Sequence, residues 1–235
     1  MFGRYETPFS FRAPDLFIGL QDSGPSQLYV RECRGTRVEK ILAQKNNTLI
    51  INPVEPVNLP EEITHYLEIA FCPVVLPAGA QMKIFLTFPV EIGVFIENDG
   101  IVSVLDIFSL TSARYSLYGI PSTGLITRWY SSEVHHTIPA TDPLKEGVLC
   151  LTLNNRSSSA AEVARIVLES YGMCLFYGDR VGMTATMDIR SPALAETTFA
   201  AVSSPGCENR SIDLYAARKY VVVPRKTFMM ESGMQ

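Results

Sequence analysis

The segment from Met82 to Tyr118 constrains the fold more than any other part of the chain. It alternates apolar and polar residues over most of its length and is interrupted at Phe88-Pro89 and at Asn98-Asp99-Gly100. An Asp-Gly pair between two alternating runs indicates a hairpin turn, because both turn positions need residues that tolerate positive φ. The segment therefore predicts an antiparallel β protein. It carries no nucleophile motif, no ladder of metal ligands and no phosphate-binding loop.

Short candidate strands separated by Gly, Pro and Asn continue along most of the chain. This pattern predicts an all-β, antiparallel β-sandwich architecture, with two packed sandwich-like units and little helix. Three prolines in Asn52–Pro60 predict an extended crossover there rather than a central strand. Ala160–Ser170 fits a helix or a strand, and its β-branched residues favour the strand. Pro192–Val202 predicts a short helix or turn, and Tyr220–Val223 a late strand.

A change in composition at Pro139–Gly147 predicts a linker. The segment is rich in proline and polar residues, and a new strand pattern begins at Val148. Two domains are therefore expected, an N-terminal β-sandwich unit over residues 1–142 and a second β unit over residues 147–235 with a C-terminal tail. The order of strand, Asn-rich turn, strand and aromatic strand makes the second unit immunoglobulin-like.

Composition argues against several classes of protein. The formal net charge is −4 and no cluster of Lys and Arg is present, so nucleic acid is not expected as a partner. No apolar run has the length of about 20 residues that a membrane span needs, and the first residues do not form the apolar core of a secretion signal. Five scattered cysteines without a C-x-x-C motif indicate reduced thiols in or near the core. A cytoplasmic location is therefore expected.

Charge content and charge distribution bear on partners. Charged residues make up 19% of the chain, which favours burial of some surface against another subunit and predicts a homo-oligomer, most simply a dimer. Between Asn46 and Ala113, Lys83 is the one base among eight acids. This acidic segment is either a solvated face or a surface for a cation or a basic partner.

Several linked motifs resemble a known family. They are NPVEPVNLP (Asn52–Pro60), FPVEIGVF (Phe88–Phe95), LDIFSL (Leu105–Leu110), ARYSLYGIPSTG (Ala113–Gly124) and RWYSSEV (Arg128–Val134). The chain resembles, from the FGRY start to about Phe199, an archaeal family of uncharacterised proteins known mainly from methanogens. The resemblance implies an archaeal, cytoplasmic protein. It implies no activity, and it supplies no catalytic residues.

The best candidate for a ligand site lies in the third quarter of the chain. It comprises Arg114, Tyr118, Arg128, Trp129, Glu133 and His135. Arginine beside Trp or Tyr is the composition of interaction hot spots, and arginine can bind a carboxylate or phosphate with two parallel hydrogen bonds. The alternative is that the aromatic residues belong to the core and that Arg128 pairs with Glu133 or a backbone carbonyl.

Catalytic alternatives rest on fewer residues. Glu133 and His135 share a strand face and could hold a metal together with His65 or an acid, but two local ligands are too few for a structural site, so no metal and no cofactor are expected. Glu91 is either a buried general acid or, by the pleat of the strand, an exposed side chain. The sequence thus favours a non-catalytic, cytoplasmic binding or assembly module. A metal-dependent hydrolase and a carbohydrate- or metabolite-binding β-sandwich are the alternatives.

Overall fold

The computed structural model describes residues 1–45, 47–61, 63–217 and 227–230. These residues form a nearly all-β protein, which confirms the predicted fold class. The strands are β1 (Gly3–Tyr5), β2 (Phe9–Ala13), β3 (Leu16–Ser23), β4 (Ser26–Cys33), β5 (Thr36–Leu42), β6 (Thr48–Val54), β7 (Tyr66–Leu76), β8 (Gln81–Pro89), β9 (Glu91–Asn98), β10 (Ile101–Phe108), β11 (Arg114–Tyr118), β12 (Leu125–Ser131), β13 (Glu146–Asn155), β14 (Ala161–Glu169), β15 (Phe176–Tyr177), β16 (Val181–Ser191), β17 (Leu194–Ala200), β18 (Asn209–Arg210) and β19 (Thr227–Met230).

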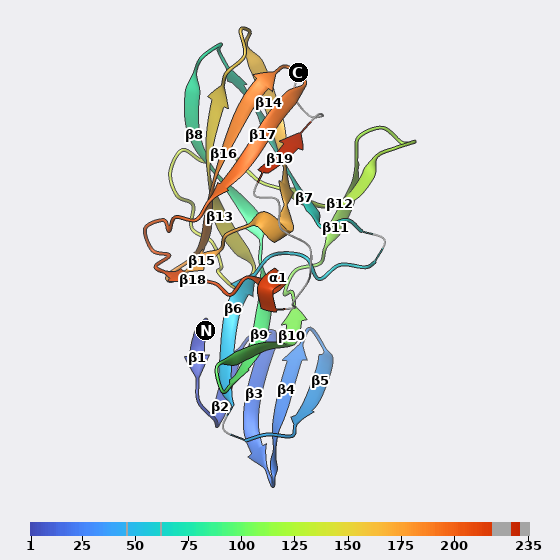
Figure 1. Cartoon of the computed structure of the whole chain (residues 1–235), viewed down its shortest axis with the longest axis vertical. Helices are drawn as coiled ribbons and strands as arrows, with labels where there is room; N and C mark the ends of the chain where they lie inside the picture. The colour runs from blue at the N-terminus through green and yellow to red at the C-terminus, as the bar shows by residue number, and fades with distance from the viewer. Residues whose placement is uncertain (46, 62, 218–226, 231–235) are drawn as a thin grey trace.

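Two sheets form the N-terminal sandwich, at the lower end of Figure 1. The first sheet has the order β2-β3-β4-β5, and the second has the order β1-β6-β9-β10. Alternating apolar residues of both sheets meet in a shared core that includes Ile18, Leu20, Leu49 and Val94. β6 and β9 are buried on both faces, because Leu49 and Val94 face this core while Ile50 and Phe95 belong to a separate apolar cluster on the other face.

The predicted hairpin at Asn98-Asp99-Gly100 is confirmed. β9 and β10 pair antiparallel across it, and Asp99 and Gly100 both have positive φ, 49° and 77°. β10 contains an irregularity between Val104 and Asp106, where one additional residue is inserted against β9. Such a bulge bends an edge strand and increases its twist.

The third and fourth sheets form a second sandwich at the upper end of Figure 1. The third has the order β11-β12-β7-β14, and the fourth contains β18-β15-β16-β13-β8 with β17 and β19 continuing from β16. Their core includes Leu67, Leu86, Leu151 and Met187. Most pairs are antiparallel, but β12 pairs with β7 and β13 pairs with β16 in parallel.

The strand pairing bears on the predicted division of the chain. β8 pairs antiparallel with β13, from Pro89 opposite Glu146 to Gln81 opposite Asn154. A long hydrogen-bonded ladder therefore runs across residue 142, and the core of the second sandwich draws residues from both sides of it. The division into independent units at residues 1–142 and 147–235 stays a prediction, as does the immunoglobulin-like character of the second unit.

Two local predictions have different outcomes. The crossover begins later than expected, since Asn52, Pro53 and Val54 still belong to β6. Pro53 is tolerated because β1 starts at Gly3, opposite Ile51, and does not reach Pro53. Pro53 therefore has a strand neighbour only in β9. Ala161–Glu169 is the strand β14, as its β-branched residues favour.

The short helix or turn predicted at Pro192–Val202 is wrong, because its centre forms β17 and pairs with β16. Pairing with a neighbouring strand overrides the local preference of its alanines. The predicted strand Tyr220–Val223 lies outside the described residues.

Helix is confined to two short elements in the described residues, a 3-10 turn at Ser170–Gly172 and α1 at Leu214–Ala217. In the described part of the chain, no helix has the length and apolarity that crossing a membrane requires. All five cysteines are free thiols. Cys33, Cys150 and Cys207 are buried and Cys174 is half-buried, but Cys72 is exposed, so the prediction of core thiols is wrong for that residue.

Candidate functional site

The β11–β12 hairpin projects from the second sandwich (Figure 1). Its strands pair from Arg114 opposite Trp129 to Tyr118 opposite Leu125. Gly119 has a φ of 100° at the start of the connecting loop, a conformation that favours glycine. β11 is the edge strand of the third sheet, while β12 is held against β7.

A pocket of about 470 Å³ lies at the base of this hairpin. It is lined by Pro89, Thr111, Ser112, Ala113, Arg114, Arg128, Trp129, Tyr130, Ser131 and Glu146. Three of the six predicted site residues, namely Arg114, Arg128 and Trp129, therefore meet in one cavity. Its size falls within the range of small-molecule sites.

Arg128 lines the pocket and also forms a buried ion pair with Glu91. Its Nη1 lies 2.5 Å from Oε1 of Glu91, and only 2% and 3% of the two side chains are exposed. The second carboxylate oxygen of Glu91 accepts a hydrogen bond of 3.0 Å from the backbone N–H of Asn58. The partner predicted for Arg128, Glu133 or a carbonyl, was thus wrong, and so was the outward orientation of Glu91.

Arg114 contrasts with Arg128. It is exposed, and it forms no ion pair with any residue that the structure describes. Because Arg114 lies directly opposite Trp129 in the antiparallel register, both side chains occupy the same face of the hairpin. The pocket therefore contains an uncommitted cation beside a large aromatic ring.

Tyr130 and Glu146 supply the other polar groups of the pocket. The Tyr130 hydroxyl donates to Glu146 Oε1 at 2.7 Å and lies 3.2 Å from Thr87 Oγ1. Burial raises the pKa of Tyr130 to about 12, so the hydroxyl stays protonated at neutral pH. This hydrogen bond fixes Glu146 at the cavity wall.

The other three predicted residues do not line the pocket. Tyr118 is buried in the core of the second sandwich. Glu133 is exposed in the segment after β12, and His135 forms two backbone hydrogen bonds with Phe85 on β8. The structure places these side chains in different environments, so the six residues do not form a single cluster.

The proposed metal ligands are not brought together either. His65 lies 3.4 Å from Glu169 and stacks against the rings of Tyr66 and Tyr171. Within the described residues, no group of three His, Cys, Asp or Glu side chains could hold a metal ion.

The acidic segment is not a uniformly solvated face. Four of its eight acids are buried, namely Glu55, Glu68, Glu91 and Asp106. Glu68 pairs with Arg165 at 2.9 Å, and Asp106 pairs with Arg31 at 2.6 Å and accepts a hydrogen bond from Tyr29 at 3.0 Å. Three of the buried acids thus lie beside an arginine, counting Glu91 with Arg128, whereas burial raises the pKa of Glu55 to about 8 and favours its protonated form.

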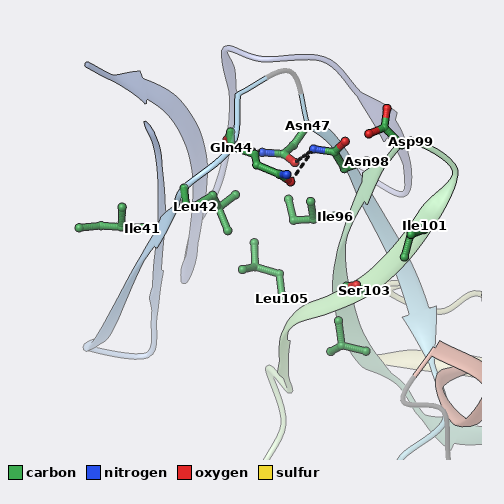
Figure 2. Close-up of a pocket in the computed structure, with 12 residues that line it drawn as sticks. Ile41, Leu42, Gln44, Asn47, Ile96, Asn98, Asp99, Ile101, Ser103 and Leu105 are labelled. Carbon is green, nitrogen blue, oxygen red and sulfur yellow. Dashed lines mark hydrogen bonds between the residues drawn. The ribbon is translucent and has the colours of Figure 1, made fainter. Parts of the chain in front are cut away.

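A larger, apolar groove of about 590 Å³ opens between the edge strands β5 and β10 (Figure 2). Its walls come from two different sheets, and amide side chains gather at one end of it. No sequence motif indicated this groove, because its two walls are separated by more than fifty residues of chain and neither wall is unusual for an edge strand.

A comparison with known families identifies the chain. A family model described as "Protein of unknown function (DUF432)" matches residues 1–231. The chain belongs to this family. The match extends beyond Phe199, where the motifs of the resemblance become less distinct, and covers both sandwiches. No curated protein and no solved structure matches the chain.

Proposed function

We propose that this member of the family is a non-catalytic binding module, with its ligand site in the pocket at the base of the β11–β12 hairpin. The ligand is a small metabolite that carries an anionic group. The observation that supports this most is the pairing of an exposed, uncommitted Arg114 with Trp129 over a cavity of about 470 Å³. Arginine can bind a carboxylate or phosphate with two parallel bonds, and the indole ring offers a surface for the body of the ligand.

The chemistry of the lining supports binding rather than catalysis. The described residues that line the pocket include no histidine and no cysteine. Its tyrosine is held protonated by burial, and its second arginine is committed to Glu91. Thr111 and Ser112 can add hydrogen bonds to a ligand, and Glu146, the one carboxylate among the described lining residues, is engaged by the Tyr130 hydroxyl.

A thermal-shift screen with sugar phosphates, and with the parent sugars as matched uncharged compounds, tests the ligand class. We expect the phosphates to raise the melting temperature of the wild type and not of Arg114→Ala. Arg12→Ala is the control, since Arg12 is exposed on β2 in the other sandwich. Equal stabilisation by the parent sugars would instead favour the carbohydrate-binding alternative. Stoichiometric zinc or iron in the purified protein would favour the metal-dependent hydrolase.

We also propose that the chain forms a homodimer through the outer edge of β11. Edge strands are usually protected by charge, by bulges or by shortness. β5 carries Arg37, Glu39 and Lys40, β10 and β14 contain irregularities, and β1 and β18 are very short. β11 has no such protection after Arg114, and its side chains Tyr115 and Leu117 are exposed.

An antiparallel pair of β11 strands centred on Ser116 is self-complementary. Such a register places Tyr115 opposite Leu117 of the second copy, and Arg114 opposite Tyr118, so like charges do not face each other. Sedimentation at micromolar concentration should show a dimer for the wild type and a monomer for Leu117→Lys. The control is Val202→Lys, another exposed apolar position. A monomeric wild type would contradict the proposal.

The cytoplasmic location expected from the sequence belongs to the same proposal. It is supported by the five free thiols, because a reducing compartment keeps cysteines unpaired. The archaeal source that the resemblance implies stays a prediction.

A further inference from the structure

We infer that the groove between β5 and β10 binds an uncharged amphiphile, that is, an alkyl chain that ends in a hydroxyl or amide head. This site lies in the N-terminal sandwich, on strands that do not contribute to the hairpin pocket. The inference is therefore independent of the function proposed above.

The middle of the groove is apolar and open. Leu42, Ile96 and Leu105 are half-buried and form its floor against the core of the sandwich. Ile101 stands at the rim and is 61% exposed, whereas Ile41 points away from the groove, on the opposite side of β5 from Leu42, as Figure 2 shows. A hydrophobic ligand would remove the apolar floor and Ile101 from water.

Both ends of the groove are bridged, so its length is set by the fold. At one end the Lys40 ammonium on β5 donates a hydrogen bond to the backbone carbonyl of Leu105 on β10. At the other end Asn98 Nδ2 donates to Gln44 Oε1 at 2.9 Å and to Asn47 Oδ1 at 3.2 Å, as Figure 2 shows. These bridges join the two sheets and hold the groove in a preformed shape, which lowers the cost of binding.

The amide end is suited to an uncharged polar head. Asn47 is buried, and its Nδ2 donates a hydrogen bond of 2.7 Å to Gln27 Oε1. This bond fixes the Asn47 side chain that Asn98 contacts. Gln44 Nε2 and Asn98 Oδ1 have no partner among the described residues, so one donor and one acceptor stay available. A hydroxyl or a primary amide can accept from the first and donate to the second.

The charges around the groove argue against an anionic head. Asp99 is the one charged side chain among the described residues that line it. The nearest base on the adjoining strand, Lys40, already donates to the Leu105 carbonyl at the opposite end. A fatty-acid carboxylate at the amide end would meet Asp99 in the groove lining, whereas Lys45, the base next to Gln44 in the chain, is exposed and does not line the groove.

Titration calorimetry on the full chain with 1-decanol, decanoate and decylammonium below their micelle concentrations tests the inference. These probes share one chain length and differ in the charge of the head. We expect saturable binding of decanol at one site per chain and binding of decanoate that is at least about tenfold weaker. Gln44→Ala should weaken decanol by about tenfold, as loss of a hydrogen bond does.

A filling variant locates the site. Ser103 is exposed and lines the groove, so Ser103→Phe should abolish decanol binding and leave the melting temperature unchanged. The matched control, Ser122→Phe in the hairpin loop, should bind decanol like the wild type. Equal binding of decanoate, tighter binding of decylammonium, or unaltered binding by Ser103→Phe would each overturn the inference. So would a dimer that Ser103→Phe dissociates without any probe binding, since the groove would then be an interface between copies.

Discussion

Arg128 and Glu91 join the two sandwiches through a nearly solvent-free ion pair of 2.5 Å. Arg128 comes from β12 of the hairpin, and Glu91 is the first residue of β9 in the second sheet. The pair therefore anchors the base of the hairpin to the N-terminal sandwich. The pair also lies beside the hairpin pocket. Arg128 lines this pocket, and so does Pro89, which is two residues before Glu91.

Removal of one partner should be strongly destabilising. Arg128→Ala removes the guanidinium that lies 2.5 Å from the buried Glu91 carboxylate, and breaking a buried ion pair from one side typically costs about 3–5 kcal/mol. Urea unfolding of the variant and the wild type measures this loss. Arg37→Ala is the control, because Arg37 pairs with Glu32 and Glu39 at the surface and should cost about 1 kcal/mol or less. A loss for Arg128→Ala as small as that of the control would show that the pair does not hold the hairpin.

Glu55 should make stability fall as the pH rises. Burial raises the pKa of its carboxyl to about 8, although it accepts hydrogen bonds from the backbone N–H of Leu214. The folded protein then holds this proton more tightly than the unfolded chain, whose carboxyl titrates near 4.5. The stabilisation is complete below pH 4.5 and is lost as the pH rises from there through 8, at up to about 1.4 kcal/mol per pH unit.

Unfolding free energies measured from pH 4.5 to 9 test this assignment with Glu55→Gln. The variant has no proton to release at this position, so its profile should be flatter than that of the wild type over this interval. Glu61→Gln is the control, since Glu61 is exposed, and its profile should match the wild type. Parallel profiles for Glu55→Gln and the wild type would mean that Glu55 is already charged in the folded protein at low pH.

Gly147 should not tolerate a side chain. A Cβ at this position would lie 2.3 Å from the Phe88 ring, which is itself fully buried. Gly147→Ala should therefore destabilise the protein by about 1–3 kcal/mol through overpacking. The double variant Gly147→Ala/Phe88→Leu should recover part of this loss, because leucine lacks the atoms that clash. Thermal unfolding of both variants measures the effect, and an unchanged melting temperature for the single variant would contradict the close packing.

Cleavage between Ala140 and Gly147 should leave the two fragments associated. The β8–β13 ladder and the shared core of the second sandwich hold together the parts on either side of this segment. Limited proteolysis followed by gel filtration should give one native peak, which separates into two fragments only in denaturant. Fragments that separate without denaturant would instead support independent units at residues 1–142 and 147–235.

The parts of the fold that follow from local pattern were predictable. Alternation and the Asp99-Gly100 turn give the class and the β9–β10 hairpin, because both depend on adjacent residues. The strand β17 was not predictable, because it forms by pairing with β16, and this tertiary interaction outweighs the local propensity of its residues. The ladder between β8 and β13 joins segments about sixty residues apart and leaves no local signal.

The candidate site shows the same limit. Arg114 and Trp129 could be named from composition, and their shared face follows from the register of one hairpin. The partner of Arg128 could not be named, because Glu91 lies 37 positions away in another sheet. A signal was present in Glu91 itself, an acid set between Pro89 and an apolar run, because a buried acid either pairs with a cation or is neutralised by a raised pKa. No such signal in the sequence indicated the groove between β5 and β10.

Trp129 offers the most direct measurement of the central claim, since it is the one tryptophan in the chain and lines the hairpin pocket. Its fluorescence can be titrated with glucose 6-phosphate and other sugar phosphates, with glucose as the uncharged control. We predict a saturable change for at least one phosphate, a loss of that change in Arg114→Ala at an unaltered melting temperature, and no response to glucose. An Arg114→Ala variant that binds the same phosphate with the affinity of the wild type would contradict the proposed site.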